Sequence, residues 1–160
     1  HERKMEMVEP YILPLSSHFY GWAQATTEHI GFLFACGSFG RKLEVVMLRI
    51  GAPRPLDLSI YKGDPVQYKR DLGAYLSPRD LTQLVTRAIE TPDIENEHGI
   101  PWHVVYGISN NTRAFWSLSN ARRVLGYEPE DDSEVTYADD IRGFLVGDRA
   151  TGGIGRVGLS

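Results

Sequence analysis

The sequence lacks three features that define large classes of proteins: paired cysteines, an excess of basic residues and a long apolar run. A single cysteine, Cys36, excludes an internal disulfide and favours a reducing compartment, so we expect a cytoplasmic protein. The formal net charge of -4 offers no basic surface to nucleic acid or to an anionic membrane. No stretch reaches the ~20 apolar residues that a membrane-spanning helix needs. The expected partner is therefore a small molecule or a protein.

The composition that remains is that of an ordinary globular domain. The chain has 160 residues, of which 42% are hydrophobic and 24% charged, enough for one sizeable core. We expect a single domain over 1–160. Its first 17 residues carry Pro10 and Pro14 and should run extended, and residues 148–160 form a glycine-rich tail.

The apolar pattern predicts helices alternating with short strands, which favours an α/β fold. Residues 19–37 are nearly uncharged and apolar on more than one side, which predicts a helix buried on most faces. The most secure helix covers 77–90, with Ser77 as its N-cap and Pro78 at its first position. Strands are expected within 42–51 and 102–109, further helices at 117–125 and 137–146, a long loop at 52–75 and a solvated acidic turn at 128–134.

A glycine motif near the end, "TGGIGRVG" at 151–158, matches the spacing of dinucleotide-binding loops. That motif works only between a strand and a helix, because the helix N-terminus holds the pyrophosphate. Only two residues follow Gly158 in this sequence. We therefore do not interpret the tail as a cofactor loop and assign no cofactor-binding residue.

The histidines and the cysteine also invite site interpretations. The densest group of potential metal ligands comprises Glu95, Glu97, His98 and His103. Its spacing matches no zinc site, so we interpret it as a solvated loop and predict no metal. A nucleophilic Cys36 would need a polarised, partly exposed thiol, whereas the apolar run "FLFACG" favours a buried one.

Tyr20 and Gln24 begin the stretch whose spacing points to a specific chemistry. They are four residues apart, which places both on one helix face. The stretch "YGWAQATTEHIG", followed by "EVVMLRIG", resembles the Tyr-Gly-x-x-Lys-x-x-x-Glu helix and the Leu-Arg strand of extended short-chain dehydrogenases, the NAD-dependent epimerase/dehydratase family. Two later stretches, "RDLGAYLSPRDLTQLVTRAIETP" and "VVYGISNNTRAFWSLSNARRVLGYEPEDDSE", resemble the C-terminal part of its uronate dehydrogenase-like members.

The resemblance implies a fold and a set of roles. The fold would be the C-terminal half of a Rossmann-type α/β structure, with few parallel strands and flanking helices. Tyr20 matches the catalytic tyrosine, which accepts the proton of the substrate hydroxyl while a hydride leaves for NAD. Arg70 matches the arginine that binds the carboxylate of a sugar acid, and a bidentate guanidinium suits that task. Ala52 stands where uronate-specific enzymes place a serine that contacts the substrate.

Gln24 departs from the family pattern, because it occupies the position of the catalytic lysine. A cation ~4 Å from a phenolate stabilises it by about 4 kcal/mol at an effective dielectric near 20, and glutamine supplies no such charge. The resemblance also places the family's glycine loop and its catalytic serine before the first residue of this sequence. We therefore expect this chain to be incomplete or inactive when it is alone, with NAD not bound by it.

Three functional hypotheses follow. The first is an NAD-dependent oxidoreductase piece acting on sugar acids, with the N-terminal half supplied separately. The second is a non-catalytic sugar-acid-binding or protein-interaction module derived from that fold. The third, weaker hypothesis is a sugar-nucleotide epimerase or dehydratase. Since the 19–37 helix carries many apolar side chains and one acid, we also expect a homodimer that buries this helix.

Overall fold

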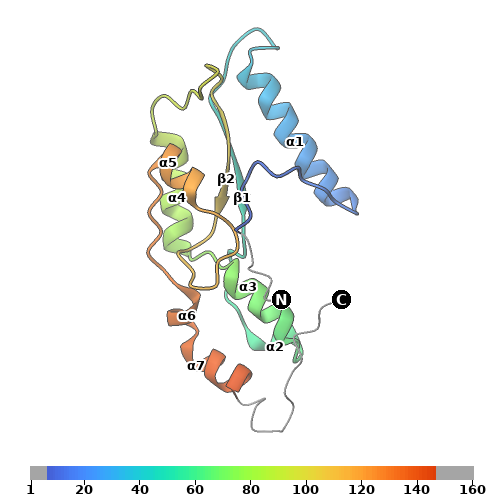
Figure 1. The fold of residues 1–160 in the computed structure, drawn as a ribbon, viewed down its shortest axis with the longest axis vertical. Helices are drawn as coiled ribbons and strands as arrows, with labels where there is room; N and C mark the ends of the chain where they lie inside the picture. The colour runs from blue at the N-terminus through green and yellow to red at the C-terminus, as the bar shows by residue number, and fades with distance from the viewer. Residues whose placement is uncertain (1–6, 147–160) are drawn as a thin grey trace.

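Two parallel strands form the centre of the computed structural model, which describes residues 7–146 (Figure 1). Strand β1 (Val45–Ile50) pairs with β2 (Trp102–Gly107), with Val45 opposite Trp102 and Ile50 opposite Gly107. Around them lie α1 (Phe19–Ala35), α2 (Leu58–Tyr61), α3 (Pro65–Gly73), α4 (Pro78–Glu90), α5 (Ser119–Leu125), α6 (Ser133–Thr136), α7 (Ala138–Ile141) and the π-helical turn η1 (Arg142–Val146). The parallel sheet with flanking helices confirms the expected α/β class.

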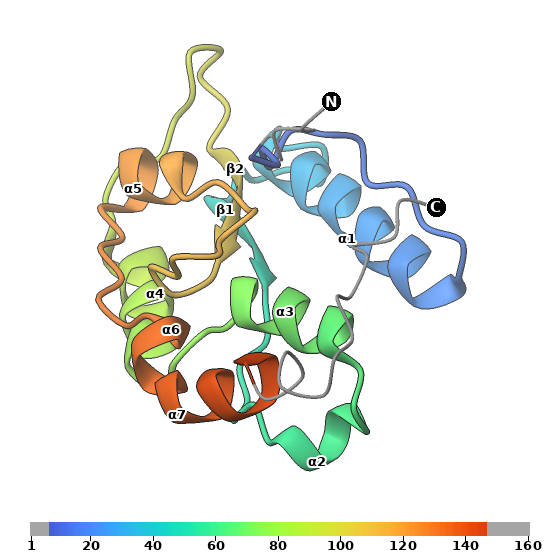
Figure 2. The ribbon, with the colours of Figure 1, turned by 60° about the horizontal axis from the view of Figure 1, so that its bottom comes forward.

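Helices cover both faces of the sheet. Figures 1 and 2 show α1 on one side of the strands and α4 and α5 on the other. Gly31 of α1 lies directly over β1, since a Cβ at this position would be 3.1 Å from both the Met47 sulfur and a Val45 methyl. On the opposite face, Leu84 of α4 and Val105 of β2 belong to one buried cluster. This cluster is the first apolar core, and its other buried members are Ile108, Leu118, Ala121, Leu125 and Tyr127.

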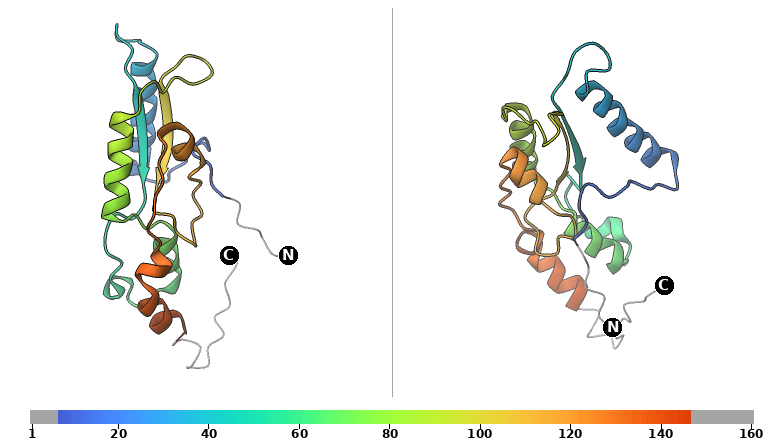
Figure 3. Two further views of the ribbon diagram at one scale, coloured as in Figure 1. Left: turned by 90° about the vertical axis from the view of Figure 1, so that its left-hand side faces the viewer. Right: turned by 45° about the horizontal axis from the view of Figure 1, so that its top comes forward.

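A second apolar core lies beyond the carboxyl ends of the strands. It comprises Ala52, Leu56, Tyr61, Tyr68, Leu72 and Tyr75, with Tyr137, Ile141 and Phe144 packed against it. The aromatic rings meet edge to face, as between Tyr61 and Tyr68, whose centroids are 5.1 Å apart. Figure 3 shows α3, α6 and α7 gathered at this end of the sheet. The last helices of the described chain thus close the end of the sheet at which α/β proteins bind ligands.

The two outer edges of the sheet differ. Beside β2, the Asn120 side chain of α5 donates a hydrogen bond of 2.6 Å to the carbonyl of Val104, so part of this edge is occupied. Within residues 7–146, no strand pairs with the outer edge of β1. The backbone groups along that edge of β1 are therefore free of sheet partners in the part of the chain that the structure describes.

A buried aspartate joins α4 to the end of β2 and to the segment after α5. Asp80 is fully buried and accepts hydrogen bonds from the Ser109 hydroxyl at 2.6 Å and from the backbone N–H groups of Glu130 and Asp131 at 3.0 and 3.1 Å. Ser77 caps α4 as predicted, by accepting a bond from the Asp80 N–H. Asp80 thus ties together three segments that are distant in sequence.

Most predicted elements are confirmed, but the expected loop at 52–75 is wrong. That segment contains α2 and α3, and both begin at an aspartate N-cap. Asp57 accepts a bond from the Ser59 N–H, and Asp64 accepts bonds from the N–H groups of Val66 and Gln67, with Pro65 at the first helical position. These are ordinary helix-start signals that the proline and glycine residues of the segment obscured.

Three further predictions, all about burial, are also wrong. The helix at 19–37 was expected to be buried on most faces, yet Ala35 is the one buried residue of α1. The acidic stretch 128–134 was expected to be a solvated turn, yet Pro129 and Ser133 are buried there and α6 begins within it. Apolar composition predicted burial for α1, but no other described element covers its outer side. Cys36, expected to be buried, is half-exposed.

His103 is buried on β2 rather than in the solvated loop expected for it. Its Nε2 donates to the carbonyl of Ile94 at 3.0 Å, and its buried Nδ1 has no partner within residues 7–146. Burial lowers the pKa of His103. The position is the second residue of β2, and residues 103–107 of this strand are all buried, so the imidazole has almost no access to water.

We expect this burial to make stability pH-dependent. The unfolded chain binds a proton at His103 near pH 6.5, whereas the folded chain binds it only at lower pH. The contribution is therefore fully present above about pH 6.5 and is lost as the pH falls through the folded pKa. Urea titrations at several pH values should show a decline below pH ~6.5 that is reduced in His103→Gln. The exposed His98→Gln serves as control; an unchanged decline in His103→Gln would contradict the assignment.

Candidate functional site

Tyr20 and Gln24 lie in the first turns of α1. The helix begins after His18, an extended N-cap residue whose Nδ1 accepts a bond of 3.3 Å from the Gly21 N–H. The Tyr20 side chain is 73% exposed, and Gln24 is exposed as well. Figure 1 shows that α1 runs antiparallel to the strands. The first residues of α1 therefore lie at the end of the sheet where the strands finish. The tyrosine is thus placed at the ligand-binding end of the fold and is open to solvent.

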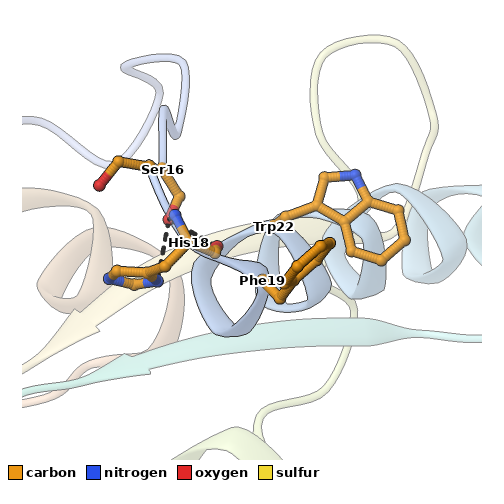
Figure 4. Close-up of a pocket in the computed structure, with 5 residues that line it drawn as sticks. Ser16, His18, Phe19 and Trp22 are labelled. Carbon is orange, nitrogen blue, oxygen red and sulfur yellow. Dashed lines mark hydrogen bonds between the residues drawn. The ribbon is translucent and has the colours of Figure 1, made fainter.

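A shallow depression of about 310 Å³ lies beside this helix start. Figure 4 shows Ser16 and His18 on one side of it and the rings of Phe19 and Trp22 on the other, and Ser17 completes its lining. The Ser16 hydroxyl lies 3.2 Å from Nδ1 of His18, and within residues 7–146 no carboxylate hydrogen-bonds to this histidine. Tyr20 does not line the depression. These residues therefore cap the helix and do not form a proton-transfer site with Tyr20.

A bidentate ion pair between Arg49 and Glu28 fixes α1 to the sheet. Arg49 of β1 donates from Nε and Nη2 to the two carboxylate oxygens of Glu28, at 2.7 and 2.8 Å. Glu28 stabilises the charged guanidinium and raises the pKa of Arg49. The guanidinium also lies 5.6 Å from the ring centre of Tyr106, a cation–π contact. Glu28 follows Tyr20 by eight residues and Gln24 by four, on the same side of α1, so this ion pair sets the orientation of that side.

Ala52 lies just past the end of β1, in the second core. Its N–H donates to the carbonyl of Ala74 at 2.7 Å, and its own carbonyl accepts from the Leu76 N–H at 3.1 Å. It forms an isolated parallel bridge with Tyr75. The backbone at this position is therefore fixed, while the methyl side chain offers no hydrogen bond to a substrate.

Arg70 lies on α3 with most of its side chain in solvent. Its Nε and Nη2 both lie 3.3 Å from one oxygen of the buried Asp71. Arg54, which follows β1, donates to the other oxygen of Asp71 at 3.1 Å. Neither Arg54 nor Asp71 was predicted from the sequence; the available signal was an arginine between two prolines shortly after a strand.

The structure brings some of the predicted residues together and leaves others apart. Ala52 belongs to the second core, and Arg54, two residues after it, shares the Asp71 carboxylate with Arg70. No hydrogen bond or ion pair in the described range joins Tyr20 to either of them. Residues 7–146 hold no group of three histidine, cysteine or acidic side chains placed to bind a metal ion. The "TGGIGRVG" motif lies outside the described residues. Of the helices that the structure describes, none is both long and apolar enough to cross a membrane.

Comparison with known proteins shows relatives that are oxidoreductases. No family model matches the chain. It is 35% identical over 138 residues to the NAD-dependent glucose-6-phosphate dehydrogenase of Haloferax volcanii, covering 86% of this chain and 45% of that protein. It is 38% identical over 120 residues to the uronate dehydrogenase of Pseudomonas syringae pv. tomato, covering 75% of this chain and 37% of that one.

The fold also matches solved structures. A uronate dehydrogenase mutant from Agrobacterium tumefaciens, in complex with NAD, superimposes with a TM-score of 0.64 at 20% identity, covering 87% of this chain and 45% of that one. This likeness confirms the expected partial Rossmann-type fold. The chain resembles a partial uronate dehydrogenase-like protein, and it spans less than half the length of the relatives that it matches.

Proposed function

We propose that this chain forms the substrate side of an NAD-dependent oxidoreductase of sugar acids and is inactive by itself. The observation that carries the proposal is the placement of Tyr20 at the carboxyl end of the sheet, on a helix fixed to β1 by Glu28 and Arg49. Both residues of this pair belong to the stretch that resembles the dehydrogenase helix and strand. Tyr20 would accept the proton of the substrate hydroxyl, and a cytoplasmic location suits such an enzyme.

The described residues do not fit a dinucleotide. A pyrophosphate is usually held by free N–H groups at a helix N-terminus. Here the three longest helices are closed by their own side-chain caps: His18 on α1, Asp64 on α3 and Ser77 on α4. Gln24 adds no positive charge beside Tyr20. We therefore propose that an NAD site forms only when a separate glycine-loop segment completes it.

The proposal is tested by complementation. The chain would be mixed with the glycine-loop half of the Pseudomonas syringae uronate dehydrogenase and assayed for NADH formation with hexuronates. We expect no NAD binding to the chain alone by calorimetry, and slow turnover in the mixture. Gln24→Lys should raise that turnover by about a hundredfold, since acid–base groups contribute about 10²–10⁴. Tyr20→Phe is the matched negative control.

Two results would contradict this proposal. Micromolar NAD binding to the chain alone would show that it holds its own cofactor site. A mixture in which Gln24→Lys stays inactive would favour the alternative, a binding module that has lost the chemistry. The observation in favour of that alternative is the pair of departures at Gln24 and Ala52, both of which remove a polar contribution to the reaction.

We also propose that the chain forms a homodimer through α1. α1 exposes large apolar side chains, among them Trp22 at 63%, and a surface of this kind usually marks an interface. The set comprises Phe19, Trp22, Ile30, Phe32, Leu33 and Phe34. A two-fold axis beside α1 would bury the same side chains on both copies.

Light scattering on the pure chain tests the dimer. We expect a dimer for the native sequence and a monomer for Trp22→Asp, because a charge at the centre of an apolar interface stays unpaired. Ile89→Asp is the control, since Ile89 is equally apolar and exposed but lies on α4. An 18.0 kDa monomer for the native sequence would refute the proposal.

A further inference from the structure

The side chain of Asp71 organises the surface around Arg70. Asp71 is buried, and it accepts hydrogen bonds from the Tyr61 hydroxyl at 3.2 Å, from Arg54 at 3.1 Å and from two nitrogens of Arg70 at 3.3 Å. A buried carboxylate is stable only when such partners compensate for the lost water. Each arginine therefore has a defined position on one side of this carboxylate.

The two arginines carry more positive charge than Asp71 neutralises. Together the three groups have one net positive charge, and within residues 7–146 neither arginine has a second acidic partner. Their side chains are 56% and 68% exposed, for Arg54 and Arg70 respectively. A guanidinium has five N–H donors, so each arginine keeps donors that point away from Asp71. The surface thus presents two fixed donor groups to solvent.

The location of this pair is that of a ligand site. Arg54 follows β1 by a few residues, and Arg70 stands near the end of α3, beyond the carboxyl ends of the strands (Figure 1). Open parallel sheets bind ligands beyond the carboxyl ends of their strands. Ala52, the position that the family resemblance assigns to substrate contact, lies in the same segment as Arg54.

We propose that Arg54 and Arg70 together form a two-arginine seat for the oxyanion of a sugar substrate, with Asp71 as the residue that positions both. This inference rests on the proposed function and adds Arg54 and Asp71 to it. The shared chemistry is an oxygen anion on a hexose, a carboxylate or a phosphate, and planar guanidinium groups bind either one through paired hydrogen bonds. A neutral hexose would not be retained.

A purely structural role predicts a different outcome. If the arginines served only to neutralise Asp71, replacing either one would alter stability but no ligand would discriminate between the variants. Ligand affinity is therefore the readout that separates the two explanations, with melting temperature recorded alongside it.

The experiment is an NMR titration of the chain with glucuronate, glucose 6-phosphate and glucose. We expect at least one of the two anions to bind more tightly than glucose, and Arg54→Gln and Arg70→Gln each to weaken that anion about ten- to hundredfold, the contribution of charged hydrogen bonds. Arg54→Lys should recover only part of the loss, because lysine keeps the charge but not the planar fork. Lys69→Gln, an exposed cation on the same helix, should have little effect.

The two anions are distinguished by pH. A sugar phosphate loses one charge near pH 6, whereas a carboxylate stays ionised, so acidification to about pH 5.5 weakens phosphate binding alone. The inference is overturned if neither anion exceeds glucose, or if Arg54→Gln leaves the affinity unchanged. The titration contains neither NAD nor the glycine-loop half of the complementation experiment. Failure of the anion to bind would therefore not contradict the complementation result, and failure of complementation would not contradict anion binding.

Discussion

Replacing Asp80 with alanine is expected to lower the free energy of unfolding by about 3–5 kcal/mol. The change removes the carboxylate that accepts hydrogen bonds from the Ser109 hydroxyl and from the backbone N–H groups of Glu130 and Asp131. Three donors would then be left without this partner, and each buried unsatisfied group costs about 1–3 kcal/mol. The Ser109 hydroxyl also accepts from the Ser77 N–H, so the start of α4 would lose its support.

Urea denaturation followed by circular dichroism measures this effect. Asp139→Ala is the control, because this carboxylate is almost fully exposed and pairs with Arg142 of the next turn. Exposed pairs of this kind contribute at most about 1 kcal/mol. A loss at Asp80→Ala no larger than that of Asp139→Ala would show that the three segments are held together by apolar contacts instead.

Gly51→Ala is expected to be the second most damaging change, with a loss of about 3 kcal/mol or failure to fold. Gly51 lies between the end of β1 and Ala52, where the backbone of Ala74 passes directly over it. An added Cβ would overlap the carbonyl oxygen of Ala74 and approach a methyl of Ile108 to 2.8 Å. The same carbonyl accepts the hydrogen bond from the Ala52 N–H, so relief of the overlap would displace the candidate site.

Gly143→Ala provides the matched control for Gly51. It lies in η1, with no atom within 4 Å of an added Cβ, so alanine there should be neutral or slightly stabilising. The melting temperatures of both variants show whether the loss at Gly51 comes from the local overlap or from any glycine-to-alanine change. Equal melting temperatures for the two would mean that the backbone near Gly51 adapts freely.

The fold was predictable wherever local signals and apolar pattern agreed. Ser77, Pro78 and Gly126 mark helix ends in the sequence, and the structure confirms these boundaries. The prediction failed within 52–75, where the equally clear caps Asp57 and Asp64 were missed because the prolines and glycines of this segment predicted a loop. Burial was the least predictable property, since it depends on which other segment covers a helix, as α1 shows.

The candidate site was predictable in part and for a physical reason. Tyr20 and Arg70 belong to stretches whose pattern resembles a known family, so their positions could be carried over one by one. Asp71 and Arg54 act through contacts between residues 17 apart in sequence, and no local pattern reveals such a pair. His103 shows the same limit, because whether an imidazole lies in a loop or a core depends on strand register.

The unequal edges of the sheet determine how it could grow. An exposed strand edge is a template for aggregation when the sheet can add strands from both sides, because each added copy then presents a new edge. In the described part of this chain, α5 and Asn120 obstruct the edge of β2, and only β1 can accept a neighbour. Pairing of one β1 with another would consume both open edges in a single step. The arrangement therefore favours a closed assembly over a fibril.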